Sequence, residues 1–162
     1  MKIGEKKPVS TFTLQGELPL AHRSERKNAF IVTDLSFHVL EKGKSVASGN
    51  FVQGSILKVA LGDKRIAVLQ DELSVGVNYK LSVFNKKGEE VRSHKFSESI
   101  RDLEVYGESV YVLTNTELYV FTEGKDAIQL SLDGEYADVG VFNEDCVILC
   151  GETQANIRIL DR

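Results

Sequence analysis

The segment SVYVLTNTELYVFTEGK, residues 109–125, decides the fold because it recurs along the chain. Residues 28–44, NAFIVTDLSFHVLEKGK, align with it without a gap at an offset of 81 residues, and two diverged copies begin at Arg65 and Asp145. In each copy, apolar and polar residues alternate along short runs separated by turns, which is typical of β-hairpins. One such unit cannot bury its apolar face alone, so we predict that the copies stack on one another.

Turn residues mark where each unit begins and ends. Turns are expected before the second strand at residues 62–64, 107–108 and 143–145, and after the third strand at residues 41–44, 85–88 and 122–125. Most of these turns contain glycine, which accepts the positive φ of a tight reversal. A four-stranded sheet repeated at roughly 37 to 44 residues is typical of propeller blades.

We therefore predict an all-β, β-propeller-like ring of about four antiparallel four-stranded blades in a single domain. The blade-like units cover residues 18–54, 55–98, 99–134, and 135–162 plus 9–17. The last unit lacks a fourth strand, whereas residues 9–14 (VSTFTL) match the fourth strand expected at residues 128–132. The N-terminal strand is thus expected to complete the last blade and to remove exposed edges. We favour closure within one chain, and closure between two chains would give a homodimeric ring.

Units such as SVYVLTNTELYVFTEGKDAIQLSLDGE resemble the blades of WD40-like, PQQ-like or NHL-type β-propellers. The resemblance covers nearly the whole chain. The sequence contains no Trp, and so it has neither the WD dipeptide nor a tryptophan docking motif. The resemblance implies a fold more than a function, because propellers host hydrolases, lectins and scaffolds alike.

Composition narrows the partners and the compartment. The formal net charge of -4 and the pI near 5.5 argue against binding nucleic acid, which needs clustered Lys and Arg. No apolar run reaches the roughly 18 residues of a membrane span, and the first residues, MKIGEKKPV, carry charges where a signal peptide has an apolar region. We predict a cytoplasmic protein, or an extracytoplasmic one if the sequence belongs to a longer polypeptide.

The cysteines and histidines do not indicate a metal site. Cys146 and Cys150 lie in one predicted strand with Cα atoms roughly 13 Å apart, which is too far for a disulfide, and we expect both to be small core residues. His22, His38 and His94 fall at non-equivalent positions of the repeat. We predict no metal and no cofactor.

The innermost strand of each propeller blade lines the central channel, and here these strands are expected at residues 56–61, 100–105 and 136–141. Lys58, Asp102 and Asp138 align at one position of these strands, with Arg101 beside Asp102. These four residues are our candidates for a ligand site in the channel. The competing expectation is that the charges pair with one another or with channel water, since buried charge must be compensated.

The second unit carries about eight additional residues at 70–78 (QDELSVGVN) between its second and third strands. Its apolar members Leu73, Val75 and Val77 are the best candidates for a partner contact, because loops carry function more often than strands do. A tolerated difference in loop length explains the same residues equally well.

The sequence shows no phosphate loop, nucleophile elbow, HExxH or CxxC motif. Our leading interpretation is therefore a non-catalytic protein-interaction or scaffold module with a protein partner. The alternative is a small-ligand binder or an enzyme with its site at the channel mouth. A third interpretation is an assembly component made of chains that exchange strands.

Overall fold

A computed structural model describes residues 12–25, 28–51, 55–72, 76 and 78–160. Within these ranges the chain forms fifteen β-strands in four antiparallel sheets, which we call A to D in chain order, and no helix. Sheet A comprises β1 (Pro19–Glu25), β2 (Asn28–Thr33), β3 (Ser36–Glu41) and β4 (Lys44–Asn50). Sheet B comprises β5 (Ser55–Leu61), β6 (Arg65–Asp71), β7 (Tyr79–Asn85) and β8 (Glu90–Phe96).

Sheet C comprises β9 (Ile100–Tyr106), β10 (Ser109–Thr114), β11 (Glu117–Thr122) and β12 (Ile128–Ser131). Sheet D comprises β13 (Asp138–Asn143), β14 (Cys146–Cys150) and β15 (Ala155–Ile159). The strands of each sheet pair in sequence order, so every sheet is a simple meander. The predicted turns after the third strands are confirmed, with positive φ at Gly43, Gly88 and Gly124.

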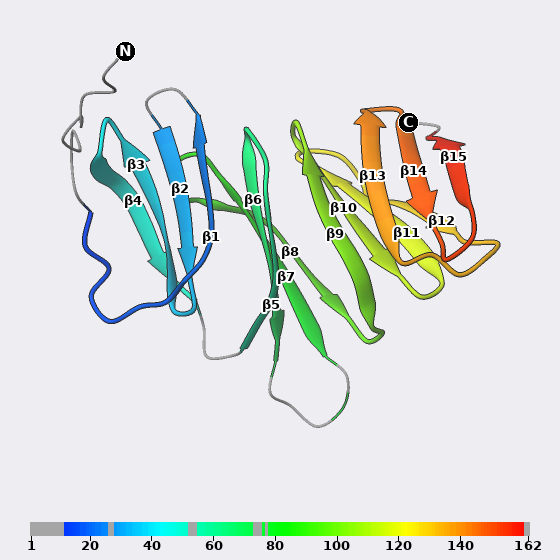
Figure 1. The fold of residues 1–162 in the computed structure, drawn as a ribbon, viewed down its shortest axis with the longest axis horizontal. Helices are drawn as coiled ribbons and strands as arrows, with labels where there is room; N and C mark the ends of the chain where they lie inside the picture. The colour runs from blue at the N-terminus through cyan, green and yellow to red at the C-terminus, as the bar shows by residue number, and fades with distance from the viewer. Residues whose placement is uncertain (1–11, 26–27, 52–54, 73–75, 77, 161–162) are drawn as a thin grey trace, which may run out of the picture.

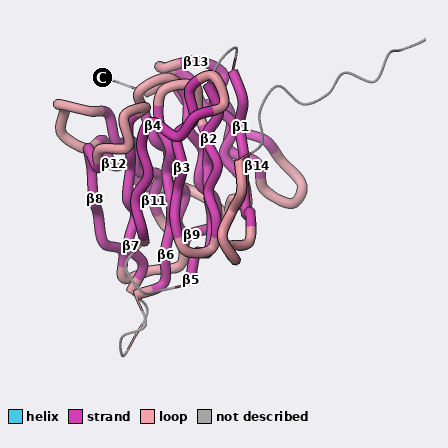
Figure 2. The backbone as a smooth tube through the Cα atoms, turned by 90° about the vertical axis from the view of Figure 1, so that its left-hand side faces the viewer, coloured by secondary structure: helices cyan, strands magenta, loops and turns pink. Residues whose placement is uncertain are grey.

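The four sheets stand side by side in a row, with sheet A at one end and sheet D at the other (Figure 1). Contacts join β1 to β5, β5 to β9 and β9 to β13, so the first strands of neighbouring sheets are adjacent. Viewed along the row, the sheets stack behind one another (Figure 2). This arrangement matches successive blades whose first strands form an inner row.

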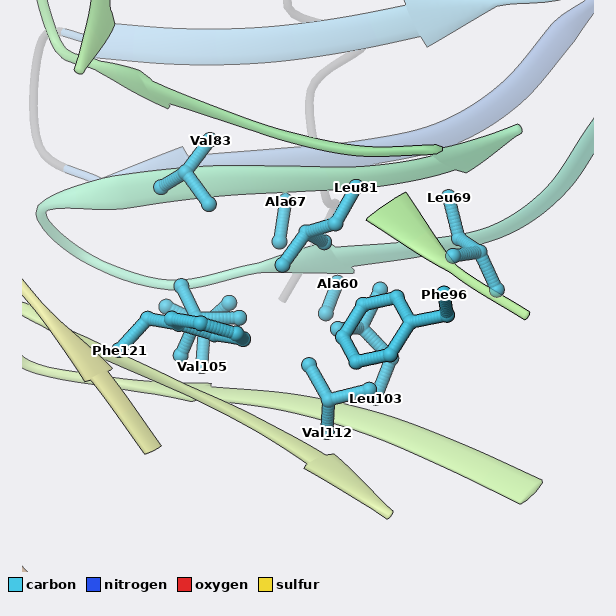
Figure 3. Close-up of a cluster of buried hydrophobic side chains, with 11 residues drawn as sticks. Ala60, Ala67, Leu69, Leu81, Val83, Phe96, Leu103, Val105, Val112 and Phe121 are labelled. Carbon is cyan, nitrogen blue, oxygen red and sulfur yellow. The ribbon is translucent and has the colours of Figure 1, made fainter. Parts of the chain in front are cut away.

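Each gap between two sheets is filled by one apolar core. Phe30, Val32, Ile66 and Val68 belong to the core between sheets A and B. The core between sheets B and C includes Ala67, Leu69, Val110 and Val112 (Figure 3), and the core between sheets C and D includes Tyr111, Leu113, Val147 and Leu149. Alternation along each strand thus sends successive side chains to opposite neighbours.

Strand register allows the sheets to be compared position by position. We call the side of a sheet that points to the next sheet in chain order its forward face, and the opposite side its backward face. Two cross-strand pairs at the centre define each forward face: Phe30 with Val39 and Val32 with Phe37 in sheet A, Ala67 with Val83 and Leu69 with Leu81 in sheet B, Tyr111 with Val120 and Leu113 with Leu118 in sheet C, and Ile148 with Ile157 and Cys150 with Ala155 in sheet D.

The predicted all-β fold of four antiparallel sheets is confirmed, but two features differ from a closed four-blade ring. Sheets A and D lie at opposite ends of the row and do not meet (Figure 1). Sheet D has three strands among the described residues. The strand predicted at residues 9–14 lies partly outside the described residues, and its described part, residues 12–14, forms no strand. Phe12 instead contacts His38 of sheet A, with ring centroids 4.9 Å apart.

The cysteine prediction is half right. Cys146 and Cys150 are free thiols on one face of β14, as expected. Both are half-buried and lie on the forward face of sheet D, so the expectation that they are core residues was wrong. The buried residues of β14 are Val147 and Leu149, which point to sheet C.

None of the described residues forms a helix that is long and apolar enough to cross a membrane.

Candidate functional site

The candidate channel residues lie in the inner row because they belong to the first strands of sheets B, C and D, and the first two of these strands share an irregularity. The pairing register shifts between Ile56 and Lys58 in β5, and the same shift occurs opposite Thr114 in β9. After the shift, Lys58 pairs with Leu69, Asp102 with Leu113 and Asp138 with Cys150, which are equivalent positions. The three charged side chains therefore lie on the forward faces of sheets B, C and D at the same height.

Lys58 and Asp102 each connect their strand to the next one, and Asp138 bonds back to Asp102. The Lys58 Nζ donates to Asp102 Oδ1 at 2.9 Å and to the Arg101 carbonyl oxygen at 2.6 Å. The Asp102 Oδ2 accepts a hydrogen bond from the backbone N–H of Val139 at 3.1 Å. Arg23 of β1 acts similarly, because its Nη1 donates to the Leu61 carbonyl oxygen at 2.9 Å. Side chains thus link the four inner strands from β1 to β13.

The two aspartates of the row differ in acidity. Burial pushes the pKa of Asp102 upward, but hydrogen bonds from Asp138, Lys58 and the backbone of Val139 outweigh it and bring the pKa to about 2. The hydrogen bond to Asp102 and then burial raise the pKa of Asp138. Hence Asp102 holds the negative charge and Asp138 is the carboxyl group that retains a proton more readily.

Glu104 extends the acidic character of the inner row. Burial, and then the charges of Asp102 and Asp138, raise the pKa of Glu104. Carboxyl groups with raised pKa values can act as hydrogen-bond donors or proton carriers. Within the described ranges, no group of three or more His, Cys, Asp or Glu side chains is placed to hold a metal ion.

Arg101 does not join this row through its side chain. Its Nε donates to Asn115 Oδ1 at 2.5 Å, and its guanidinium borders a shallow hollow lined also by Glu135 and Tyr136. Of the four predicted channel residues, the structure brings three together and uses the backbone of the fourth. Sequence reasoning missed Asn115 and the backbone N–H of Val139, because neither is recognisable from residue type.

The predicted partner loop lies between β6 and β7. Leu73, Val75 and Val77 lie outside the described residues. The base of the loop is closed by a hydrogen bond from the Glu72 backbone N–H to the Asn78 carbonyl oxygen at 2.9 Å, and Lys95 pairs with Glu72 at 2.7 Å.

The forward face of sheet D is a second candidate site that the sequence analysis missed. Phe142 is 70% exposed, Ile157 is 70% exposed and Ile159 is 79% exposed. The pairs at the centre of the forward faces of sheets A, B and C are at most 4% exposed. The sequence signal was present, because the strand at 157–160 (IRIL) is as apolar as its buried counterparts.

Solved structures share this arrangement. The computationally designed Ika4 protein matches with a TM-score of 0.69 at 11% identity, covering 96% of this chain and 99% of that chain. Hsv2 from Kluyveromyces lactis matches with a TM-score of 0.59 at 14% identity, covering 90% of this chain and 47% of that chain. BBS1N, solved in complex with ARL6DN, matches with a TM-score of 0.60 at 14% identity, covering 88% of this chain and 50% of that chain.

Hsv2 and BBS1N are β-propellers, so the four sheets have a propeller-like fold. The chain spans about half the length of these two proteins. At such identities the likeness concerns the fold alone, and the WD40, PQQ or NHL type stays a prediction.

A search of curated proteins finds no match. A family model described as "Family of unknown function (DUF5711)" matches residues 9–123, which is more than half of the chain. The chain therefore belongs to the DUF5711 family.

Proposed function

We propose that this protein is a non-catalytic interaction module that binds a protein partner through the forward face of sheet D. The observation that carries the proposal is the exposure of Ile157 and Ile159 together on that face, beside the equally exposed Phe142 at the register shift of β13. Large contiguous apolar patches on a soluble domain mark interaction sites, and aromatic and aliphatic side chains dominate the centres of interfaces. One of the two propellers with a similar fold, BBS1N, was solved in complex with a protein partner, and this agrees with such a role.

The inner row supports a structural role for its charges. Lys58 and Asp102 are bonded to each other and to the backbone of the next strand, so their polar atoms are already engaged. Such links hold neighbouring sheets at a fixed spacing. A rigid row of sheets presents its end face with little conformational cost on binding.

The test is a capture experiment with tagged chain and an extract of the source organism. Wild type is compared with Ile157→Lys, which places a charge at the centre of the face, and with Leu57→Lys. Leu57 is 46% exposed on β5 in the middle of the row, so Leu57→Lys is the matched control. We expect at least one protein that wild type and Leu57→Lys retain and Ile157→Lys loses. Equal capture by all three chains would contradict the proposal.

A ligand site at the inner row is the second candidate, favoured by the raised pKa values of Asp138 and Glu104. Two neighbouring carboxyl groups of this kind suit a cationic ligand. Isothermal titration of wild type and Asp138→Asn with spermidine, an organic polycation, tests it. Binding that weakens at least tenfold in Asp138→Asn would support this candidate, and the absence of binding to wild type would contradict it.

A further inference from the structure

We propose that the partner on the forward face of sheet D is a second copy of this chain, which docks the backward face of its sheet A there. Two copies joined head to tail in this way close a ring of eight sheets. The inference rests on the proposed function, since it names the partner of the same face. Four independent features of the two ends of the row support it.

The first feature is the equivalence of the forward faces. Ile148 and Ile157 of sheet D occupy the positions of Tyr111 and Val120 in sheet C, and those residues are buried against sheet D. The corresponding pairs of sheets A and B are likewise buried by the sheet that follows. Sheet D therefore presents a surface of the kind that, three times in this molecule, accepts the backward face of another sheet.

The second feature is the backward face of sheet A. Ile31 pairs with His38 there, at the position held by Val112 and Tyr119 in sheet C. Val112 and its equivalents in sheets B and D, Val68 and Leu149, share a core with the preceding sheet. Because sheet A stands at the end of the row, Ile31 has no preceding sheet within the described part of the chain (Figure 1).

The third feature is the place of Phe12. Its ring lies 4.9 Å from His38. At the equivalent place in sheet C, Phe96 of β8 lies 5.2 Å from Tyr119. Since β8 is the outer strand of the sheet that precedes sheet C, Phe12 occupies the place of the outer strand of a sheet that would precede sheet A.

Sheet D is the sheet that fits this place. It has three strands among the described residues, and its missing outer strand is the one that residues 12–14 of the partner copy would add. Adding a strand also covers the edge of β15 that no described strand pairs with. The head-to-tail contact thus completes one sheet and covers both the apolar forward face of sheet D and Ile31 on the backward face of sheet A.

The fourth feature is Asp138. Its equivalent Asp102 accepts a hydrogen bond from the backbone N–H of Val139 in the next inner strand. Val139 pairs with Leu149 on the backward face of sheet D, and the equivalent residue of sheet A is His22, which pairs with Ile31. The carboxyl group of Asp138 is therefore expected to meet the backbone N–H of His22 of the partner copy.

A ring of this size agrees with two of the solved structures that have a similar fold. The four sheets align with 47% of Hsv2 and 50% of BBS1N, both of which are propellers. The two ends of the row are different and complementary, so the contact is heterologous, and two such contacts related by a two-fold axis close the ring.

The experiment measures the mass of the purified chain by light scattering across a hundredfold range of concentration. Wild type and Leu57→Lys are expected at twice the 18.0 kDa of one chain. Ile157→Lys changes the forward face of sheet D, and Ile31→Lys changes the backward face of sheet A. Both variants are expected to be monomers. Circular dichroism confirms that each variant is folded, and Phe12→Asp replaces Ile31→Lys if the latter is not.

A mixture of the two monomeric variants tests whether one intact contact is enough for dimerisation. Folded Ile157→Lys and Ile31→Lys monomers each keep one intact end, so an equimolar mixture is expected to form a dimer through a single contact. If Ile31→Lys alone stays dimeric, two sheet D faces meet each other and the head-to-tail proposal is wrong. Trimers or larger assemblies of wild type would overturn the two-copy ring.

A monomeric wild type would also overturn this inference, and the capture experiment then decides the proposed function separately. Another protein whose capture depends on Ile157 would leave the proposed function standing with a different partner. If no protein is captured in that way, both proposals fail.

Discussion

Sheets C and D carry the same pattern of side chains on their forward faces and have opposite surroundings. Leu113 and Val120 of sheet C are at most 1% exposed, whereas Ile157 at the position of Val120 is 70% exposed. The strands themselves are paired in the same way. The neighbouring sheet, and not the strand, therefore decides whether these positions are core or surface. In the proposed head-to-tail contact, the apolar residues that sheet D exposes in one chain become core positions.

The largest expected effect comes from truncating equivalent residues on the two faces. Leu113→Ala is expected to lower the free energy of unfolding by about 2–5 kcal/mol, because it leaves a cavity in the core between sheets C and D. Cys150→Ala at the same position of sheet D should cost less than about 0.5 kcal/mol, since that face is uncovered. Urea unfolding in the Ile157→Lys background measures both values. Equal losses would mean that sheet D is covered within one chain.

The next effect concerns two glycines. A Cβ at Gly62 would lie 2.4 Å from Val105 Cγ1, so Gly62→Ala crowds the contact between sheets B and C and is expected to cost about 1–3 kcal/mol. At Gly140, on the forward face of sheet D, the nearest atom would be the Ile148 carbonyl oxygen at 4.0 Å. Gly140→Ala should therefore stay within about 0.5 kcal/mol of its parent. Thermal unfolding of both variants in the monomeric Ile157→Lys background measures the two losses of stability. A large loss for Gly140→Ala would mean that the forward face of sheet D is as crowded as the contact between sheets B and C.

Asp102 of sheet C and Asp138 of sheet D are equivalent carboxyl groups whose contributions to stability are expected to differ. Asp102 accepts hydrogen bonds from Lys58 and Val139, so Asp102→Asn is expected to cost about 1–2 kcal/mol at pH 7. Both variants are compared in the monomeric Ile157→Lys background, where no partner copy meets Asp138. There Asp138→Asn removes a charge whose ionisation the folded state disfavours, and it should leave stability at pH 7 unchanged or slightly higher. Urea unfolding of both variants at pH 7 checks this, and a larger loss for Asp138→Asn would reverse the roles of the two carboxyl groups.

The smallest effect is the pH dependence of the same pair. The lowered pKa of Asp102 gives stability that is present above its ordinary pKa of 3.8 and is lost as the pH falls toward about 2. The raised pKa of Asp138 acts in the opposite direction: its contribution is present below 3.8 and is lost as the pH rises through the folded-state pKa. The difference between wild type and Asp102→Asn should therefore shrink between pH 4 and pH 2. A difference that is constant over this range would contradict the assignment.

Much of the fold could be predicted from the alternation of the sequence. The runs at residues 110–114 and 118–121 lie within β10 and β11, and the turns fall where glycine permits a reversal. The same alternation fixes the register. For this reason Lys58 and Asp102, which the repeat alignment placed at equivalent positions, are in contact in the structure. Side-chain period and turn chemistry are local properties, so a single sequence contains them.

The open row and the exposed end face could not be predicted in the same way. The angle between neighbouring sheets depends on packing across each core, which repeated strand patterns do not encode. In the last unit, the cysteines of β14 were aligned one residue out of place, because both faces of that strand are apolar. Val147 and Leu149 therefore took the core positions that had been expected for Cys146 and Cys150.

The measurement that tests the central claim most directly is cross-linking with a short bismaleimide. In the head-to-tail contact, Ile31 takes the place that Leu149 has opposite sheet C, so a cysteine at this position should lie near Cys150 of the partner copy. We predict that Ile31→Cys yields a covalent dimer, whereas wild type, with its two cysteines on sheet D alone, remains a single chain. Equal cross-linking of wild type and Ile31→Cys, or none in either protein, would contradict the account.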